Sequence, residues 1–206
     1  MLINIQSNAK LNLGLKILNK RDDGYHNIST LIQEIDLYDS IELSTDNSYN
    51  ITLSLEGIST PSDKDNLCYK AAKLFLDEYN ISNGIHIKLN KSIPIGAGLG
   101  GGSSNAANTI KGLYQLFNID IDNETINNLC SKLGADVPFF INGGLQTSEG
   151  IGHDLTPRNF LLEKIYFLII YPNVQISTQW AYSEYKNYLE NTLIQTNFMP
   201  LSDKIN

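Results

Sequence analysis

The chain has 206 residues, 42% of them hydrophobic, with a formal net charge of −7 and a pI of about 4.9. This composition is typical of a folded globular protein, and the acidic charge argues against nonspecific nucleic-acid binding, which needs a basic surface. Two cysteines are too few for a disulfide framework, and the longest apolar run is far shorter than the roughly 20 residues of a membrane span. We therefore expect a cytoplasmic protein with neither nucleic-acid nor membrane partners.

Hydrophobic periodicity in the first part of the chain predicts mainly strands. Asp23 and Gly24 predict a tight turn over residues 21–25 between two of them. A helix is predicted from about Asp65, which can cap its first turn. The segments with a strand-like pattern are 2–5, 11–17, 30–36, 40–44, 49–55 and 85–89.

The second part of the chain begins with a glycine-rich loop, in which five glycines fall within the seven positions 96–102. An amphipathic helix follows the loop, and another begins at Asp122. Residues 165–171 form an apolar run stopped by Pro172, which predicts a buried strand. Because runs of strands are separated by only a few helices, we expect an α+β fold, with a domain transition near residue 150.

The glycine loop allows four interpretations. A flexible linker is disfavoured, because a strand precedes the loop and a helix follows it abruptly. Gly96, Gly98 and Gly101 fit the dinucleotide pattern G-x-G-x-x-G, but the βαβ context is missing, and a P-loop would need a Lys-Ser or Lys-Thr after the glycines. In a phosphate cradle of another design, glycine amides and the helix N-terminus bind phosphate. Ser103 and Ser104 then either add hydroxyls or simply cap the helix.

Several segments together resemble one superfamily of kinases. The motif PIGAGLGGGSSNAA at residues 94–107 is similar to the phosphate-binding motif of the galactokinase–homoserine kinase–mevalonate kinase–phosphomevalonate kinase (GHMP) superfamily. Within it, the chain resembles the branch that phosphorylates a cytidine-diphosphate-linked methylerythritol in the non-mevalonate isoprenoid pathway. The segments that carry this closer resemblance are AKLNLGLKI at 9–17, KRDDGYHNISTLIQEIDLYD at 20–39, LGADVPFF at 133–140, EGIG at 149–152 and YPNVQIST at 171–178.

The resemblance implies a fold and an activity. Residues 1–150 would form a GHMP kinase N-terminal domain of the ribosomal protein S5 domain 2-like type, and residues 151–206 the start of a second α+β domain. The activity would be the transfer of the γ-phosphate of ATP, with Mg²⁺, to the 2-hydroxyl of the methylerythritol moiety of a small-molecule cytidine diphosphate substrate. Phosphoryl transfer depends mostly on positioning and electrostatics, so a lysine, an aspartate, Mg²⁺ and an amide cradle suffice.

The resemblance also implies roles for individual residues. Asp136 would be the catalytic base, and Lys10 would pair with it and with the attacking oxygen, offsetting the charge that develops there. On residue type alone, Asp136 would more readily cap a turn, and Lys10 would be an ordinary exposed strand lysine. The residues implied to bind the substrate are Asn12, Tyr25, His26, Thr178 and Tyr182, with the cytosine stacked between the two tyrosines and hydrogen-bonded by His26. The residues implied to bind ATP are Pro94, Ile95, Gly96, Ala97, Gly98, Leu99, Gly100, Gly101, Gly102, Ser103 and Ser104 in the loop, with Asn66 and Lys91 on the adenosine side, and Ser104 would also bind the Mg²⁺.

Three features depart from the pattern of the family. Asn8 stands where Pro is usual before AKLNL, and His153 stands where Glu is usual after GIG. No glycine follows Thr178, so the third glycine-rich motif is missing and the chain looks C-terminally shortened. We therefore expect an exposed apolar surface and a monomer or weak homodimer. The alternative function is a shortened remnant that binds nucleotide but is catalytically weak or inactive.

Overall fold

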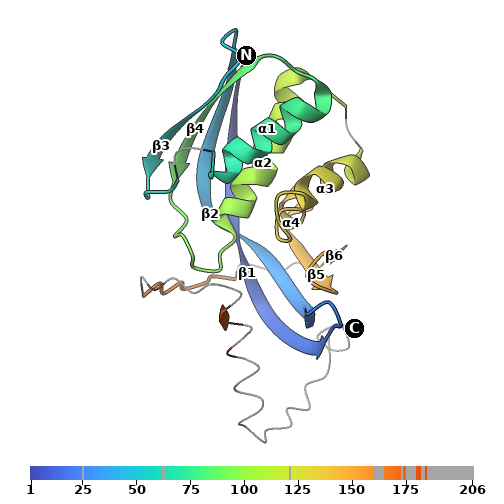
Figure 1. Ribbon diagram of the computed structural model, residues 1–206. Coiled ribbons are helices and arrows are strands. Elements are labelled where there is room, and N and C mark those ends of the chain that lie inside the picture. The colour runs from blue at the N-terminus through green and yellow to red at the C-terminus, as the bar shows by residue number, and fades with distance from the viewer. Residues whose placement is uncertain are drawn as a thin grey trace, which may run out of the picture.

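The computed structural model describes residues 1–24, 26–61, 64–120, 122–159, 165–172, 174, 180–181 and 184. These residues form one mixed sheet with helices packed on one face, as Figure 1 shows. The expected α+β class is confirmed, because runs of strands are interrupted by few helices and do not alternate regularly with them.

The sheet has six strands in the order β3-β4-β2-β5-β6, with β1 paired to β2 outside this path. Among the described strands, only β3 and β4 pair in parallel, and every other pairing is antiparallel. The expectation that a βαβ context is missing before the glycine loop is therefore wrong, because β3, α1 and β4 form one parallel βαβ unit. The next described strand after the loop and α2 is β5, which pairs with β2 and not with β4, whereas a dinucleotide-binding fold continues its parallel sheet there. The strands are β1 (Leu2–Lys20), β2 (His26–Asp46), β3 (Ile51–Gly57), β4 (Gly84–Lys91), β5 (Leu145–Glu149) and β6 (Asp154–Pro157).

The longest strand, β2, organises the sheet because its partners change along its length. On one edge it pairs with β1, from His26 to Ser44. On the opposite edge, residues 40–46 pair with β4 and residues 30–33 pair with β5. Where β1 ends and β2 begins, the two strands extend beyond the helices as a curved arm (Figure 1). One strand therefore connects the part of the sheet under the helices to the arm.

β1 and β2 are each continuous where the sequence predicts two shorter strands. The register of β1 against β2 shifts between Asn8 and Ala9 and again between Asn12 and Gly14. Such bulges absorb a break in the alternation and bend the strand without ending it. The predicted turn of the arm is present, since Gly24 has a φ of 87° and its N–H donates to the carbonyl oxygen of Arg21 over 3.1 Å.

Side-chain caps begin two of the helices. The predicted cap of the first helix is wrong by one residue, because Asn66, and not Asp65, accepts the N–H of Cys68 at 2.8 Å. The helix predicted to begin at Asp122 is α3, and Asp122 caps it by accepting the N–H of Thr125 at 2.8 Å. Within the described ranges, no helix is long and apolar enough to cross a membrane. The helices are α1 (Leu67–Tyr79), α2 (Gly101–Phe117), α3 (Asn123–Ser131) and α4 (Phe139–Asn142).

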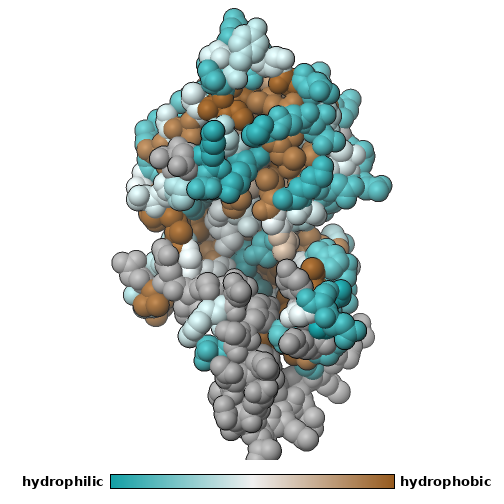
Figure 2. Space-filling model, in the orientation of Figure 1, coloured by the Kyte–Doolittle hydropathy of each residue, from teal (hydrophilic) through white to brown (hydrophobic). Residues whose placement is uncertain are grey.

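The main hydrophobic core lies between the sheet and the helices α1 and α2, which run side by side across one face (Figure 1). α2 passes close to the sheet at Gly112, where a Cβ would lie 2.3 Å from Cδ1 of Ile5 and 2.5 Å from Cδ1 of Leu43. Figure 2 shows hydrophilic residues over this helical side, with hydrophobic residues visible between them. The core therefore fixes α2 against β1 and β2. Its fully buried large side chains include Ile41, Leu43, Phe75, Ile85, Ile87, Ile110 and Leu113.

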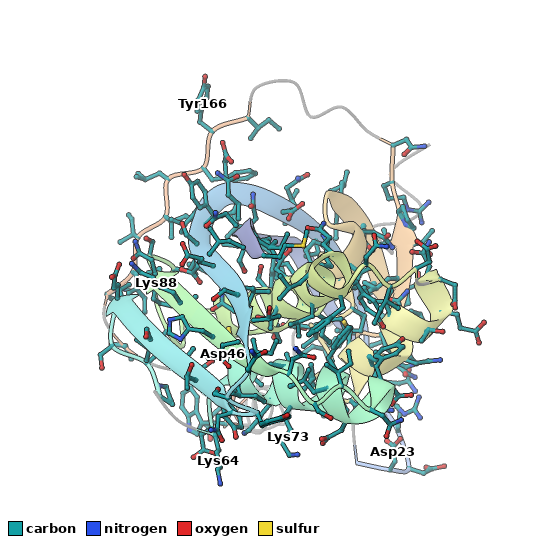
Figure 3. The ribbon with its side chains drawn as sticks, turned by 90° about the horizontal axis from the view of Figure 1, so that it is seen from above. Asp23, Asp46, Lys64, Lys73, Lys88 and Tyr166 are labelled. Atoms are coloured by element: carbon teal, nitrogen blue, oxygen red, sulfur yellow. The ribbon has the colours of Figure 1, made fainter. Side chains whose placement is uncertain are left out.

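The predicted buried strand at residues 165–171 is wrong. The segment forms no ladder with any strand in the described part of the chain, and Tyr166, Leu168 and Ile170 are 90%, 88% and 80% exposed. Figure 3 shows Tyr166 pointing away from the body. An apolar run becomes a buried strand only when a neighbouring strand satisfies its backbone and covers its side chains. Apolar side chains are thus exposed on this segment, whereas the apolar surface expected on residues 1–150 stays a prediction.

Candidate active site

The glycine loop and the start of α2 line a pocket of about 360 Å³. Every residue predicted to bind ATP borders this pocket except Ser104. Asn66 enters from the start of α1, and Lys91 enters from the end of β4. The full lining consists of Thr60, Pro61, Asp65, Asn66, Leu67, Lys91, Asn105 and residues 94–103.

Every second residue from Gly96 to Gly100 has a left-handed backbone conformation, which glycine adopts without strain. Gly96, Gly98 and Gly100 have φ values of 68°, 74° and 69°, in the left-handed region that side chains with a Cβ rarely adopt. Gly100 is also the N-cap of α2, so the free N–H groups of the first helical turn lie at the pocket. A helix N-terminus preceded by a glycine-rich turn is a favourable place for an anion.

Two lysines touch the loop where glycine is needed for space. A Cβ on Gly100 would lie 2.8 Å from Cζ of Phe140 and 3.0 Å from Cγ of Lys10. A Cβ on Gly101 would lie 2.7 Å from Nζ of Lys91. The backbone N–H of Lys10 also donates to the carbonyl oxygen of Leu99 over 2.9 Å. The loop is therefore packed against both cations.

The two loop serines differ in position. Ser103 borders the pocket, whereas Ser104 is fully buried and does not. The hydroxyl of Ser104 accepts hydrogen bonds from Oγ of Ser7 at 2.8 Å and from Nδ2 of Asn108 at 3.3 Å. The structure therefore gives no support to Ser104 as a Mg²⁺ ligand, because its side chain points into the protein. Of the two serines, only Ser103 borders the pocket.

The side chain of Asn66 is engaged within the protein. Its Oδ1 caps α1, and its Nδ2 donates to the carbonyl oxygen of Pro61 over 2.7 Å. Its amide group thus joins the 60–61 segment to α1 at the pocket wall. The sequence predicted its location, and the structure adds that its hydrogen bonds shape the wall.

Lys10 and Asp136 lie next to one another although they are far apart in the sequence. Nζ of Lys10 is 3.8 Å from Oδ2 of Asp136, and it donates to Oδ1 of Asn12 over 2.6 Å. Lys10 is buried, whereas the side chain of Asp136 is 52% exposed. Burial lowers the pKa of the Lys10 ammonium group below its usual value, and the charge of Asp136 partly opposes this shift.

A series of hydrogen bonds between β1 and β2 supports the side chain of Asn12, which accepts from Lys10. Nδ2 of Asn12 donates to Oγ1 of Thr30 over 3.0 Å, and Oγ1 of Thr30 donates to the carbonyl oxygen of Gly14 over 2.7 Å. Sequence reasoning placed Asn12 beside Lys10, and the structure agrees. It did not find Thr30, because this contact depends on the register between β1 and β2.

The loop that carries Asp136 is held by backbone turns and by one buried amide. The N–H of Val137 donates to the carbonyl oxygen of Gly134 over 3.2 Å. Nε2 of Gln146, on β5, donates to the carbonyl oxygens of Phe139 and Gly143 at 3.0 and 2.8 Å. The sequence does not predict this role of Gln146, because no local sequence pattern distinguishes the residue. A small cavity beside this loop is lined by Lys10, Ile32, Asp136, Phe139 and Gly152.

The residues implied to bind the substrate are only partly described. Asn12 is at the site, whereas Tyr25, Thr178 and Tyr182 lie outside the described residues. His26 begins β2 in the arm, opposite Lys20. The residue of β2 that pairs with Lys10 is Glu34. His26 lies about 26 Å from Glu34 along β2, at roughly 3.3 Å per residue. The structure does not bring His26 into contact with Lys10 and Asp136.

Two of the departures from the family pattern have local contacts. Nδ2 of Asn8 donates to the carbonyl oxygen of Ile35 over 3.1 Å, at the first bulge of β1. Nε2 of His153 lies 3.4 Å from Oδ1 of Asp154, and its side chain is about half exposed. Neither contact reaches Lys10 or Asp136. In the described part of the chain, no cluster of three or more His, Cys, Asp or Glu side chains is arranged to hold a metal.

The fold and the glycine loop define a class of protein. Residues 66–144 match the family described as GHMP kinases N terminal domain. A crystal structure of 4-(cytidine 5'-diphospho)-2C-methyl-D-erythritol kinase superposes with a TM-score of 0.66 and 38% sequence identity, over 76% of this chain and 55% of that one.

Comparison with curated proteins identifies the family within this class. A protein of Clostridium botulinum (strain Hall), named 4-diphosphocytidyl-2-C-methyl-D-erythritol kinase, is 41% identical over 201 residues, 97% of this chain and 70% of the relative. A protein of the same name from Prochlorococcus marinus (strain AS9601) is 45% identical over 90% of this chain and 60% of the relative. The chain belongs to the 4-diphosphocytidyl-2-C-methyl-D-erythritol kinase family. It spans about 60% of the length of the Prochlorococcus relative.

Proposed function

We propose that the chain transfers the γ-phosphate of ATP to the 2-hydroxyl of 4-diphosphocytidyl-2-C-methyl-D-erythritol. One observation carries the proposal: Lys10 touches both halves of the site. Its backbone N–H donates to Leu99 in the glycine loop, and its ammonium group lies 3.8 Å from Asp136. A phosphate held by the loop would therefore lie near a carboxylate able to accept a proton from an attacking hydroxyl.

The chemistry follows from these groups. As the substrate oxygen bonds to the γ-phosphorus, its proton passes to the carboxylate of Asp136, and the bond from the γ-phosphorus to the β,γ-bridging oxygen breaks to release ADP. The Lys10 ammonium group stabilises negative charge on the attacking oxygen and on the transferred group. Glycine amides and the N-terminus of α2 hold the phosphates that do not react. The burial of Lys10 strengthens these interactions, because charges attract more strongly where water is excluded.

Mg²⁺ would enter this site bound to the phosphates of ATP. It usually keeps several waters and needs only one or two protein oxygens besides phosphate, so a site without a carboxylate cluster fits it. When bound, it neutralises charge on the β- and γ-phosphates. Ser103, and not Ser104, borders the pocket and is the serine that would supply such an oxygen.

The identity of the acceptor rests on the family. The curated relatives are named for a cytidine-diphosphate-linked methylerythritol, and we extend that substrate to this chain. Binding of cytosine by Tyr25, His26 and Tyr182, with Thr178 nearby, is part of the proposal. The division into domains 1–150 and 151–206, the cytoplasmic location and the monomeric or weakly dimeric state stay predictions.

A phosphorus NMR assay of the purified full chain tests the proposal. With ATP, Mg²⁺ and 4-diphosphocytidyl-2-C-methyl-D-erythritol, we expect a new phosphomonoester signal and equal amounts of ADP. Asp136→Asn should slow the reaction by roughly 10²–10⁴-fold, the usual contribution of a catalytic base. Asp77→Asn, in the surface pair with Lys73, is the matched control and should leave the rate unchanged. Nucleotide binding without any product would instead identify the catalytically inactive remnant and overturn the proposal.

A further inference from the structure

A buried carboxylate beneath the glycine loop has no part in the chemistry proposed above. Asp39, on β2, is fully buried and does not border the pocket. Its Oδ2 accepts from Nζ of Lys91 at 2.5 Å and from Nδ2 of Asn105 at 2.9 Å. Its Oδ1 accepts from the N–H groups of Ser92 and Ile93 at 2.7 and 2.8 Å. A buried charge is tolerated only with such partners, and here each oxygen has two.

The four partners of Asp39 flank the glycine loop on both sides. Lys91, Ser92 and Ile93 directly precede the loop, and Asn105 directly follows Ser104 at the start of the second turn of α2. A single carboxylate therefore ties together the two ends of an eleven-residue segment, 94–104, whose glycines otherwise leave the backbone free to move.

Further hydrogen bonds, made through Ser7, hold the start of α2 in the same network. Nδ2 of Asn105 also donates to Oγ of Ser7 at 2.9 Å, and Oγ of Ser7 donates to Oγ of Ser104 at 2.8 Å. The four residues of this network, Ser7, Asp39, Ser104 and Asn105, are all buried. They connect β1, β2 and α2, and Asn105 also borders the pocket.

Asp39 also holds a cation at the pocket. Lys91 borders the pocket, and its Nζ lies where a Cβ on Gly101 would be only 2.7 Å away. A buried ammonium group without a counter-charge is strongly destabilising. The hydrogen bond to Asp39 keeps it beside the first residue of α2, where a bound phosphate would also lie.

We infer that Asp39 is a positioning residue that fixes both ends of the glycine loop and holds the Lys91 ammonium group at the phosphate pocket. It acts through the loop and not on a reacting atom. The inference rests on the proposed function only for the nature of the ligand, which is the polyphosphate of an adenine nucleotide.

The test uses Asp39→Asn, which keeps the shape of the side chain. The asparagine oxygen can still accept from Ser92 or Ile93, but its amide group faces Lys91 and Asn105, which are both donors. We expect hydrogen exchange of peptides covering residues 92–105 to become faster, while peptides from α3 and β5 keep their rates. Affinity for Mg²⁺-ADP in calorimetry should fall on the order of tenfold to a hundredfold, the range for lost hydrogen bonds to charged groups.

Two further variants make the experiment decisive. Lys91→Met removes the cation but leaves the backbone contacts of Asp39, so the loop should loosen less than in Asp39→Asn. Should Asp39→Asn not fold, the double variant Asp39→Asn/Lys91→Met lacks the unpaired buried cation and takes its place. Asp122→Asn, a carboxylate at the cap of α3 that also accepts a backbone N–H, is the matched control and should leave the loop unchanged.

The outcomes separate the inference from the proposed function. Loop exchange that is unchanged in Asp39→Asn, or that is faster across the whole sheet to the same degree, overturns the inference. In the double variant, exchange equal to that of Lys91→Met alone also overturns it. Because exchange is measured without ligand, faster exchange confined to residues 92–105 supports the inference even where the unaltered chain forms no phosphorylated product.

Discussion

The two halves of the site are built differently. The glycine loop rests on buried polar groups that satisfy one another, with Asp39 and Ser7 fully buried. The other half, around Asp136, has a half-exposed carboxylate and an ion pair at 3.8 Å, which is beyond hydrogen-bond distance. The glycine loop is therefore preorganised, whereas the surroundings of Asp136 are less fixed, as expected where a ligand completes a site. Lys10 belongs to both, which makes it the most informative residue to change.

The largest effect is expected from Lys10→Met. Loss of a preorganised charge at the reacting centre typically slows catalysis by roughly 10²–10³-fold. The same change should raise the melting temperature at neutral pH, because a buried ammonium group with a lowered pKa costs stability and methionine does not. Rate assays and thermal unfolding on one sample would measure both. A drop in activity together with a drop in stability would show that Lys10 is structural.

Two alanine substitutions in the glycine loop separate the effect of a steric clash from the effect of backbone conformation. Gly98 and Gly100 both have positive φ, so alanine at either strains the backbone by about 1–3 kcal/mol. A Cβ on Gly98 meets nothing within 4 Å, whereas one on Gly100 meets Phe140 and Lys10. Gly100→Ala should therefore weaken Mg²⁺-ADP binding by roughly tenfold or more beyond Gly98→Ala. Equal affinities in calorimetry would mean that the close packing against Lys10 has no influence on the loop.

Smaller effects are expected along the contacts that orient Lys10. Asn12→Ala removes a hydrogen bond to a charged group, worth about 1.5–3 kcal/mol, so kcat should fall roughly tenfold to a hundredfold. Thr30→Val removes the two neutral hydrogen bonds of the Thr30 hydroxyl, with Asn12 and with Gly14, each worth about 0.5–1.5 kcal/mol. It should lower kcat less than Asn12→Ala does, because neither hydrogen bond is made to Lys10 itself. The reverse order of the two losses would show that Thr30 contacts the substrate directly.

The smallest effect is a pH dependence of stability. The pKa of Lys10 lies below 10.5 in the folded protein because of burial, so between that value and 10.5 the unfolded chain binds more protons. Stability relative to Lys10→Met should therefore rise with pH in this window. Lys73 is the opposite case, since its hydrogen bond to Asp77 raises its pKa, and its contribution should be lost at high pH. Urea unfolding of the unaltered chain, Lys10→Met and Lys73→Met at neutral and alkaline pH would check both signs.

The sequence predicted the glycine loop better than it predicted the buried residues that hold the loop. Residues 94–103 were predictable because the turn chemistry and the following helix are local. The contact between Ser7 and Ser104 spans 97 residues, and that between Asp39 and Lys91 spans 52, so no local pattern reveals them. Thr30 and Gln146 depend on strand register in the same way. The error at residues 165–171 has a related cause, since an apolar run does not say whether a strand will lie beside it.

The pairing of β2 with β5 has a consequence for how the protein is made. The N–H of Gly144 donates to the carboxylate of Glu34, 110 residues earlier in the chain. At a synthesis rate of roughly 5–20 residues per second, about ten seconds pass before the ribosome supplies this partner. During that interval the edge of β2 that later receives β5 has no native cover, and an uncovered strand edge invites pairing with other chains. The late synthesis of β5 thus sets the time for which this edge of β2 is open to pairing with another chain.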